Sequence, residues 1–260
     1  MRDHDLDLLR TRLQEIKLMG WIKNRRPGNV GGVGNTLEDL LGIAENNRQL
    51  PDFGDWELKS QRSKTWAPLT LFHSEPKPQE AQIVSVILLP LYGWPHYAAG
   101  TRYPAGERSF SQKIYATTWS NRGFRVNVDR NTERIFVSFD YRMIDKRHAE
   151  WRGFIRDGAG TDDINPNPYW TFADISQKLS KKLKNLMYVK AETKNSSGTE
   201  YFKYNEIEAY LDPTLDRFLN LVETGAICVD FDARTGHNHG TKFRIIPAAK
   251  ADLYQRRIVV

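Results

Sequence analysis

The spacing of apolar residues changes along this chain, and the change constrains the fold more than any other feature. Four apolar residues near the N-terminus recur at helical spacing: Leu6, Leu9, Leu13 and Ile16. This spacing predicts an amphipathic helix over residues 5–19. Later segments alternate apolar and polar residues instead, as in DWELKSQ at 55–61, which is typical of a strand. A chain that combines both periods is predicted to be an α/β protein.

Further segments extend this pattern to the C-terminus. The predicted strands are LTLF (69–72), IVSVILL (83–89), FRVNVDR (124–130), RIFVSFDYR (134–142), LMYVKAETK (186–194), EYFKYNEIEAYL (200–211), AICVDFDAR (226–234) and TKFRII (241–246). The predicted helices are TLEDLLGIAENN (36–47), the stretch from Tyr169 through SQKLSKKLK (169–184), and TLDRFLNLVETG (214–225). We interpret Thr36 with Asp39 as a capping box that begins the first of these helices. We therefore expect a mixed central sheet flanked by helices.

The overall charge favours a polyanionic partner. The 260-residue chain has a net charge of +6, a pI near 9.3 and 12% aromatic residues, which suits nucleic acid, although many basic proteins bind none. The single cysteine, Cys228, excludes an internal disulfide and a cysteine-built zinc site. The N-terminal MRDHDLDLLR lacks an apolar targeting segment, and Pro90 interrupts the longest apolar run. We expect a cytoplasmic protein that does not contact a membrane.

The stretch PDFGDWELKS at 51–60 is the first candidate site. On a strand, Glu57 and Lys59 share one face, and Asp52 can place its carboxylate beside Glu57 across the preceding turn. Two carboxylates and the backbone carbonyl of Leu58 would offer the hard oxygen ligands that Mg²⁺ prefers. Lys59 would then orient or deprotonate a water molecule. The spacing therefore supplies a hydrolytic mechanism.

The same residues also fit the solvated face of an ordinary strand. A fixed D-x4-E-x-K pattern arises by chance in about one chain in twenty of this length, given usage of roughly 6% for each residue type. Both interpretations stay open on spacing alone. Glu38 is similarly ambiguous, because a carboxylate in the first turn of the predicted helix is favoured by the helix dipole whatever else it does.

The stretch GHNHGTKFR at 236–244 is the second candidate site. A loop between two strands that carries His237, His239, Lys242 and Arg244 would place hydrogen-bond donors against base edges and phosphates. A partly exposed hairpin loop with no ligand is the alternative. Zinc is not expected, because the other histidines lack ligand spacing. The adjacent letters HNH also differ from the nuclease motif of that name, whose three residues lie far apart in sequence.

These segments together resemble a known family. The succession GNVGGVGNTLEDLLG, LPDFGDWELKS, TLF and HNHGTKFRI resembles the MvaI/BcnI family of type II restriction endonucleases, relatives of the mismatch-repair nicking enzyme MutH. YWTF with KLSKKLK, and YFKYN after AETK, resemble the same family. The likeness is best over 28–72 and 169–246. It is weakest over 76–165, where the loop LYGWPHYAAG has no counterpart.

The resemblance implies one domain over 1–260 with a MutH-like PD-(D/E)xK nuclease core and two lobes around a DNA cleft. The catalytic lobe would span roughly 1–75 and the recognition lobe roughly 165–260, each with part of the middle. The resemblance assigns Asp52, Glu57 and Lys59 to the catalytic triad and Glu38 to an accessory helix carboxylate. The residues predicted to contact DNA are His237, His239, Thr241, Lys242, Arg244 and Arg62.

The resemblance also implies an activity and its partners. We expect a monomer that uses Mg²⁺, or Mn²⁺ in its place, to cut double-stranded DNA to 5′-phosphate ends at a short, nearly palindromic C/G-rich site. A companion DNA methyltransferase would accompany it. Three alternatives remain: a MutH-like repair enzyme that nicks at a methylation-dependent site, a DNA-binding protein with an inactive site, and a protein that binds no nucleic acid.

Overall fold

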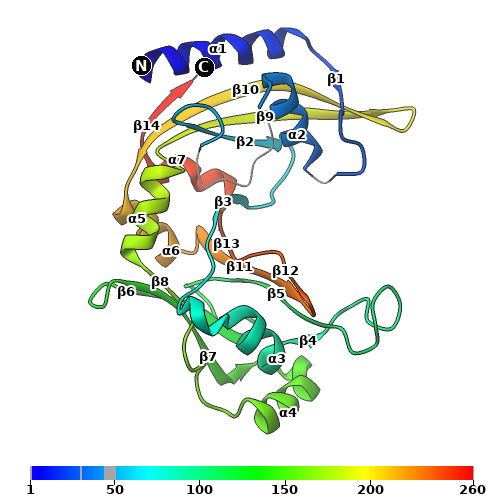
Figure 1. Ribbon diagram of the computed structural model, residues 1–260, viewed down its shortest axis with the longest axis vertical. Coiled ribbons are helices and arrows are strands. Elements are labelled where there is room, and N and C mark those ends of the chain that lie inside the picture. Colours follow the sequence, from blue (N-terminus) through cyan, green and yellow to red (C-terminus); the bar gives the residue numbers. More distant parts are fainter. Residues whose placement is uncertain (1, 30, 44–50, 260) are drawn as a thin grey trace. The chain divides into compact units, whose positions relative to one another are not determined.

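The alternating segments of the sequence form strands in the computed structural model, which describes residues 2–29, 31–43 and 51–259 (Figure 1). Contacts within the chain divide it into two units. Unit 1 comprises Met1–Leu69, Ser176–Arg217 and Lys250–Val260, and unit 2 comprises Thr70–Ile175 and Phe218–Ala249. Residues 176–217 and 250–260 thus belong to the same unit as residues 52–59. The catalytic and recognition lobes that the resemblance implies stay a prediction.

Unit 1 is built on one mixed sheet, sheet A. Its elements are α1 (Arg2–Leu18), β1 (Ile22–Lys23), α2 (Gly32–Leu41), β2 (Trp56–Arg62), β9 (Asn185–Ser196), β10 (Thr199–Pro213), α7 (Lys250–Leu253) and β14 (Tyr254–Val259). The strand order is β1-β10-β9-β2, and β14 also pairs with β10. β2 runs parallel to β9, with Glu57 opposite Leu186, whereas the other pairs are antiparallel. The predicted mixed sheet is confirmed.

Helices cover one face of sheet A. Helices α1 and α2 lie on one face (Figure 1), where Leu9, Leu13 and Leu37 pack with Trp56 and Leu58 of β2 in a largely aliphatic core. Because side chains alternate along a strand, Glu57 and Lys59 point to the opposite face. The start of β2 therefore divides its side chains between a helix-covered core and the face that carries the predicted triad.

Unit 2 contains two further sheets and the short helices between them. Its elements are β3 (Leu69–His73), α3 (Leu89–Tyr92), β4 (Trp94–Pro95), β5 (Arg108–Ile114), β6 (Arg122–Asp129), β7 (Arg134–Ile144), α4 (Ala149–Gly158), β8 (Tyr169–Thr171), β11 (Ile227–Arg234), β12 (His237–Asn238) and β13 (Lys242–Ile245). Sheet B has the order β3-β13-β11-β5-β4, with β12 beside β11, and sheet C has the order β6-β7-β8. The chain passes between the units within β3, α5 (Phe172–Lys181) and α6 (Leu215–Glu223), and again between Ala249 and Lys250.

Aromatic rings form much of the core of unit 2. Phe110 of β5 lies 5.2 Å from Phe124 of β6 and 5.4 Å from Phe231 of β11, measured between ring centroids. Trp170 of β8 lies 5.0 Å from Phe243 of β13. The Phe110–Phe124 and Trp170–Phe243 contacts join sheet B to sheet C, and edge-to-face ring pairs add to the stabilisation from burial. Because side chains alternate along β5, β11 and β13, the residues between those that face this core lie on the other face of sheet B.

Two predicted elements differ from the structure. The segment 83–89, predicted as a strand, forms a π-helix (Val84–Leu88) followed by α3. A continuous apolar run does not by itself distinguish a strand from a buried helix, and here burial recurs with a helical rather than an alternating period. The helix predicted to begin at Thr36 begins at Gly32, so the capping box is wrong. Thr36 is fully buried, and its hydroxyl accepts a hydrogen bond from the backbone N–H of Arg25.

The remaining predicted segments are largely confirmed. β2, the hairpins β6–β7 and β9–β10, β11 and β13 all form where alternation predicted them, whereas Tyr169–Thr171 is a strand ahead of helix α5. The predicted continuation of the second helix over 44–47 lies outside the described residues. None of the helices within the described ranges is long and apolar enough to span a membrane.

Candidate active site

The structure brings Asp52, Glu57 and Lys59 together in unit 1. Asp52 Oδ2 accepts a hydrogen bond of 2.8 Å from the backbone N–H of Leu58, which holds its carboxylate beside β2. Lys59 Nζ lies 2.5 Å from Glu57 Oε1, so these two side chains share one face of the strand, as alternation predicted. The turn before β2 and the strand itself therefore supply both carboxylates and the lysine.

Glu57 is the most unusual group of this site, because only 1% of the residue is exposed. Burial raises the pKa of its carboxyl group, the charge of Lys59 opposes this increase, and the nearby charge of Asp52 adds to it. A second lysine, Lys182, lies 3.5 Å from the same atom, Glu57 Oε1. A buried carboxylate is costly unless it is paired, and two lysines on one oxygen provide that pairing.

The other oxygen of Glu57 tests whether a metal ion would fit. Glu57 Oε2 is buried and has no hydrogen-bond partner among the described residues, and such an atom usually marks a missing ligand or water. Within the described ranges, no group of three or more His, Cys, Asp and Glu side chains is placed to hold a metal alone. The metal site that the sequence predicts at Asp52, Glu57 and the Leu58 carbonyl therefore stays a prediction. Two carboxylates would be enough for Mg²⁺, because this ion usually keeps several waters.

Glu38 lies on α2, which packs against β2, and the helix is half-buried at this position. Because α2 begins at Gly32, Glu38 is not in its first turn, and its carbonyl accepts the N–H of Gly42, which caps the C-terminal end. The helix dipole disfavours a carboxylate there, so the favourable dipole effect that we expected does not apply. The role of Glu38 as an accessory carboxylate stays a prediction.

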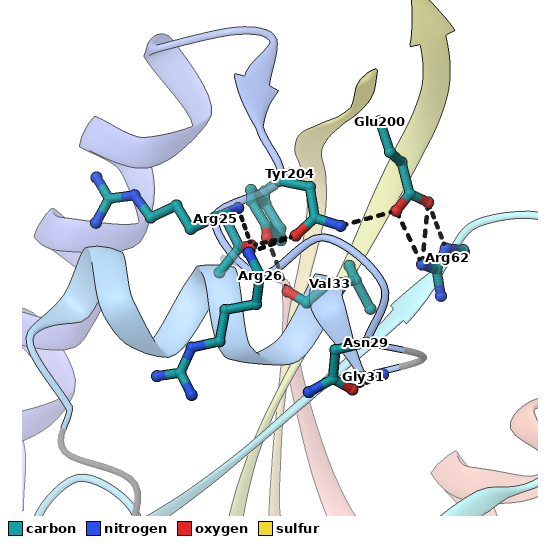
Figure 2. A network of polar contacts seen from close by, with 10 residues as sticks. Arg25, Arg26, Asn29, Gly31, Val33, Arg62, Glu200 and Tyr204 are labelled. Atoms are coloured by element: carbon teal, nitrogen blue, oxygen red, sulfur yellow. Dashed lines mark hydrogen bonds and ion pairs between the residues drawn. The ribbon is translucent and has the colours of Figure 1, made fainter. Parts of the chain in front are cut away.

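A polar network fixes α2 and the segment before it (Figure 2). Asn24 accepts a hydrogen bond of 2.8 Å from the backbone N–H of Arg26 and donates one of 3.0 Å to Glu200 of β10. The hydroxyl of Tyr204 donates to the carbonyl of Val33 at 2.8 Å. The helix that carries Glu38 is therefore tied to the centre of sheet A.

Arg62 belongs to the same network. Its guanidinium donates hydrogen bonds of 3.0 Å to Glu200 Oε1 from both Nε and Nη2, and it lies 5.6 Å from the centre of the Phe202 ring (Figure 2). A bidentate arginine–carboxylate pair has defined geometry as well as charge. In this arrangement Arg62 joins the end of β2 to β10, and the predicted contact with DNA stays a prediction.

The predicted DNA-reading loop, 236–244, lies in unit 2, where it comprises β12, a short turn and the first part of β13. His237 and His239 are exposed, and their rings form an edge contact with centroids 4.2 Å apart. Thr241 is fully buried instead, and its backbone N–H donates a hydrogen bond of 2.7 Å to Glu75. Glu75 also accepts one of 3.2 Å from Asn238. The two histidines are thus presented to solvent, whereas Thr241 holds the loop in place.

The two basic residues after this loop are paired with acids. Lys242 Nζ lies 2.8 Å from Asp232 Oδ2, and Arg244 Nε lies 2.6 Å from Asp230 Oδ2. Antiparallel pairing of β11 with β13 places these side chains on the same face of sheet B. This face presents alternating donors and acceptors rather than a block of positive charge.

A cavity of about 570 Å³ in unit 2 adjoins His239. Its lining includes Trp94, His96, Tyr97, Tyr103, Asp232 and His239. The segment 94–103 therefore lies beside the predicted reading loop. It belongs to the region where the resemblance to the family is weakest.

Sequence reasoning missed three residues of these sites. Lys182 approaches Glu57 from a position 125 residues later, and its only signal was the lysine-rich run SQKLSKKLK. Tyr254 of β14 is buried with its hydroxyl unpartnered within the described part of the chain, and burial and the charge of Glu57 raise its pKa. Glu75, on the segment after β3, gave no signal. Each contact depends on strand pairing between distant segments.

The chain is similar to proteins of one family. It matches the MvaI/BcnI restriction endonuclease family over residues 10–254. The structure of restriction endonuclease MvaI in complex with cognate DNA is 27% identical, with a TM-score of 0.78, and the match covers 98% of this chain and 97% of that chain. MvaI in the absence of DNA is 26% identical over the same shares, with a TM-score of 0.54. No curated protein matches the chain significantly.

Proposed function

The chain belongs to the MvaI/BcnI restriction endonuclease family, and we propose that it is a type II enzyme that cuts double-stranded DNA at a specific site with Mg²⁺. The observation that carries this proposal is the gathering of Asp52, Glu57 and Lys59 on β2, with one buried oxygen of Glu57 left for a ligand. Similarity to an MvaI–DNA complex supports duplex DNA as the substrate.

The metal would be held by the Asp52 and Glu57 carboxylates and the Leu58 carbonyl, and Mn²⁺ would substitute for Mg²⁺. When bound, the ion would neutralise charge on the phosphate and lower the pKa of a coordinated water. Lys59 is 23% exposed at its side chain, so its ammonium group is accessible to a water molecule beside the phosphate. As an ammonium ion it would orient that water and offset the negative charge that develops in the transition state, whereas only its neutral amine form would accept the proton of the water. The products would carry 5′-phosphate ends.

Sequence selection would come from the reading loop of unit 2. His237 and His239 are exposed and would contact base edges, and the paired Lys242 and Arg244 would add donors near them. We propose a short, nearly palindromic C/G-rich site, action as a monomer and a companion methyltransferase that protects the host site. Glu38 would assist at the catalytic centre from α2.

Digestion of an unmethylated plasmid of known sequence tests this function. With Mg²⁺, the purified protein should cut both strands at a recurring site, and sequencing of the fragment ends should give that site and 5′-phosphates. Nicking of one strand only at methylation-dependent sites would indicate a MutH-like repair enzyme instead. Specific binding without any cleavage would indicate an inactive DNA reader, and an absence of DNA binding even at low salt would contradict the proposal.

A further inference from the structure

The pairing of Glu57 with two lysines from different parts of unit 1 carries a further inference, which rests on the proposed function. Lys59 lies next to Glu57 on the same strand face, so its proximity follows from β2 alone. Lys182 reaches the same oxygen from the residue after helix α5, at 3.5 Å. The two ammonium groups carry two positive charges, which is one more than the Glu57 carboxylate needs for neutralisation.

Lys182 is held where it is by the end of the helix. Its backbone N–H donates a hydrogen bond of 2.9 Å to the carbonyl of Lys178, which extends the helical turn by one residue. Its side chain is 22% exposed, although lysine usually extends into water. The neighbouring Lys181 is exposed, so the lysine-rich run divides into one residue that points to Glu57 and one that points to solvent.

The two oxygens of Glu57 have opposite surroundings. Oε1 receives both lysines, whereas Oε2 is buried without a hydrogen-bond partner among the residues that the structure describes. A carboxylate held through one oxygen cannot rotate freely, so its second oxygen stays directed at the position that a ligand would take. A divalent cation at Oε2 would be attracted by Glu57 and Asp52 and repelled by the ammonium groups.

We propose that Lys182 is a positioning residue of the metal site, which holds the Glu57 carboxylate in place and lowers the affinity of the site for a divalent cation. It acts through Glu57 and does not contact the phosphate. The cost is weaker metal binding, and the benefit is a carboxylate fixed in the orientation that hydrolysis requires. Lys182 would thus tune how much Mg²⁺ the enzyme needs.

Titration of the full-length protein with Mn²⁺ in the absence of DNA tests this role, with the metal followed by its paramagnetic resonance signal. Lys182→Gln should bind Mn²⁺ with a dissociation constant about tenfold lower than the unchanged protein, because a nearby positive charge is lost. Lys182→Arg should restore the original value, and Lys181→Gln should leave it unchanged. At saturating Mn²⁺ and DNA, Lys182→Gln should cut about tenfold more slowly, because Glu57 is held less firmly.

Unchanged or weaker Mn²⁺ binding by Lys182→Gln would overturn the proposal, provided that thermal unfolding shows the variant to be folded. Glu57→Gln serves as the reference, because it should abolish binding at this site. If the unchanged protein cuts DNA but its Mn²⁺ binding does not depend on Glu57, the role of Lys182 fails while the proposed function stands. If it neither binds Mn²⁺ through Glu57 nor cuts DNA, both fail.

Discussion

The Glu57 site of unit 1 and the reading loop of unit 2 both combine acids with basic residues, but they pair them differently. In unit 1, two lysines share one oxygen of a buried carboxylate, and the other oxygen has no hydrogen-bond partner in the described structure. In unit 2, Lys242 and Arg244 each have an acid of their own, and two exposed histidines lie beside them. The first arrangement leaves one carboxylate oxygen for a ligand. The second offers a pattern of donors and acceptors with little excess charge, which suits the recognition of base edges.

This comparison predicts that substitutions in unit 1 change the rate of DNA cleavage, whereas substitutions in unit 2 change the choice of DNA sequence. Lys59→Ala should give the largest reduction of the cleavage rate. Loss of the group that orients the water should reduce cleavage by at least about a thousandfold. DNA affinity, measured by gel shift with Ca²⁺, should change little, because the proposed contacts to base edges come from His237 and His239 in unit 2. Lys64→Ala, at an exposed position after β2, is the matched control. Substantial remaining cleavage by Lys59→Ala would remove this lysine from the mechanism.

Glu38→Ala should also act on rate, with a reduction of about a hundredfold in single-turnover cleavage if its carboxylate assists the catalytic centre. Asp39→Asn, which breaks the ion pair with Arg26, is the control for a change of charge on the same helix. An unchanged rate would leave Glu38 without a catalytic role.

Substitution of the histidines should affect discrimination instead. His237→Ala and His239→Ala should each relax the choice at one or two base pairs by about 1 to 3 kcal/mol, while the cognate cleavage rate stays within a few-fold. Competition between cognate and single-substituted sites in one reaction measures this directly. Asn131→Ala, in the exposed turn between β6 and β7, is the control. If rate fell and discrimination did not, the division between the two units would be wrong.

Glu57→Gln should remove the metal site, and beside that loss its effect on stability should be small. Because its folded pKa is raised, the folded protein holds this proton more tightly than the unfolded chain, so a stabilising contribution present at acid pH is lost as pH rises through the raised pKa. Glutamine stays neutral at every pH. The variant should therefore be more stable at neutral pH by on the order of 1 kcal/mol, and the difference should disappear near about pH 4.

Urea unfolding at the two pH values measures this difference. A variant less stable than the unchanged protein at neutral pH would mean that attraction to the lysines outweighs the cost of burial.

The sequence predicted contacts that one strand or hairpin can produce by itself. Glu57 and Lys59 share a face because alternation requires it, and the β9–β10 hairpin follows from its own apolar pattern. Lys182, Tyr254 and Glu75 were missed, because sheet register and distant chain segments place them and neither is encoded locally. The start of α2 was missed for a different reason. Gly31 is the N-cap and offers no side-chain hydrogen bond, so the sequence carries no Ser, Thr, Asp or Asn signal at the position where the helix begins.

The strand order of sheet A also has a consequence for synthesis of the protein. β2 leaves the ribosome early, but its neighbour β9 follows more than a hundred residues later, and β14, which brings Tyr254 to the sheet, comes last. Such non-local pairing delays folding until the distant segments meet. We expect a nascent chain to lack Lys182 and the strand that pairs with β2 until translation has passed β9. A chain cut short before β9 would then be unable to damage the DNA of the cell that makes it.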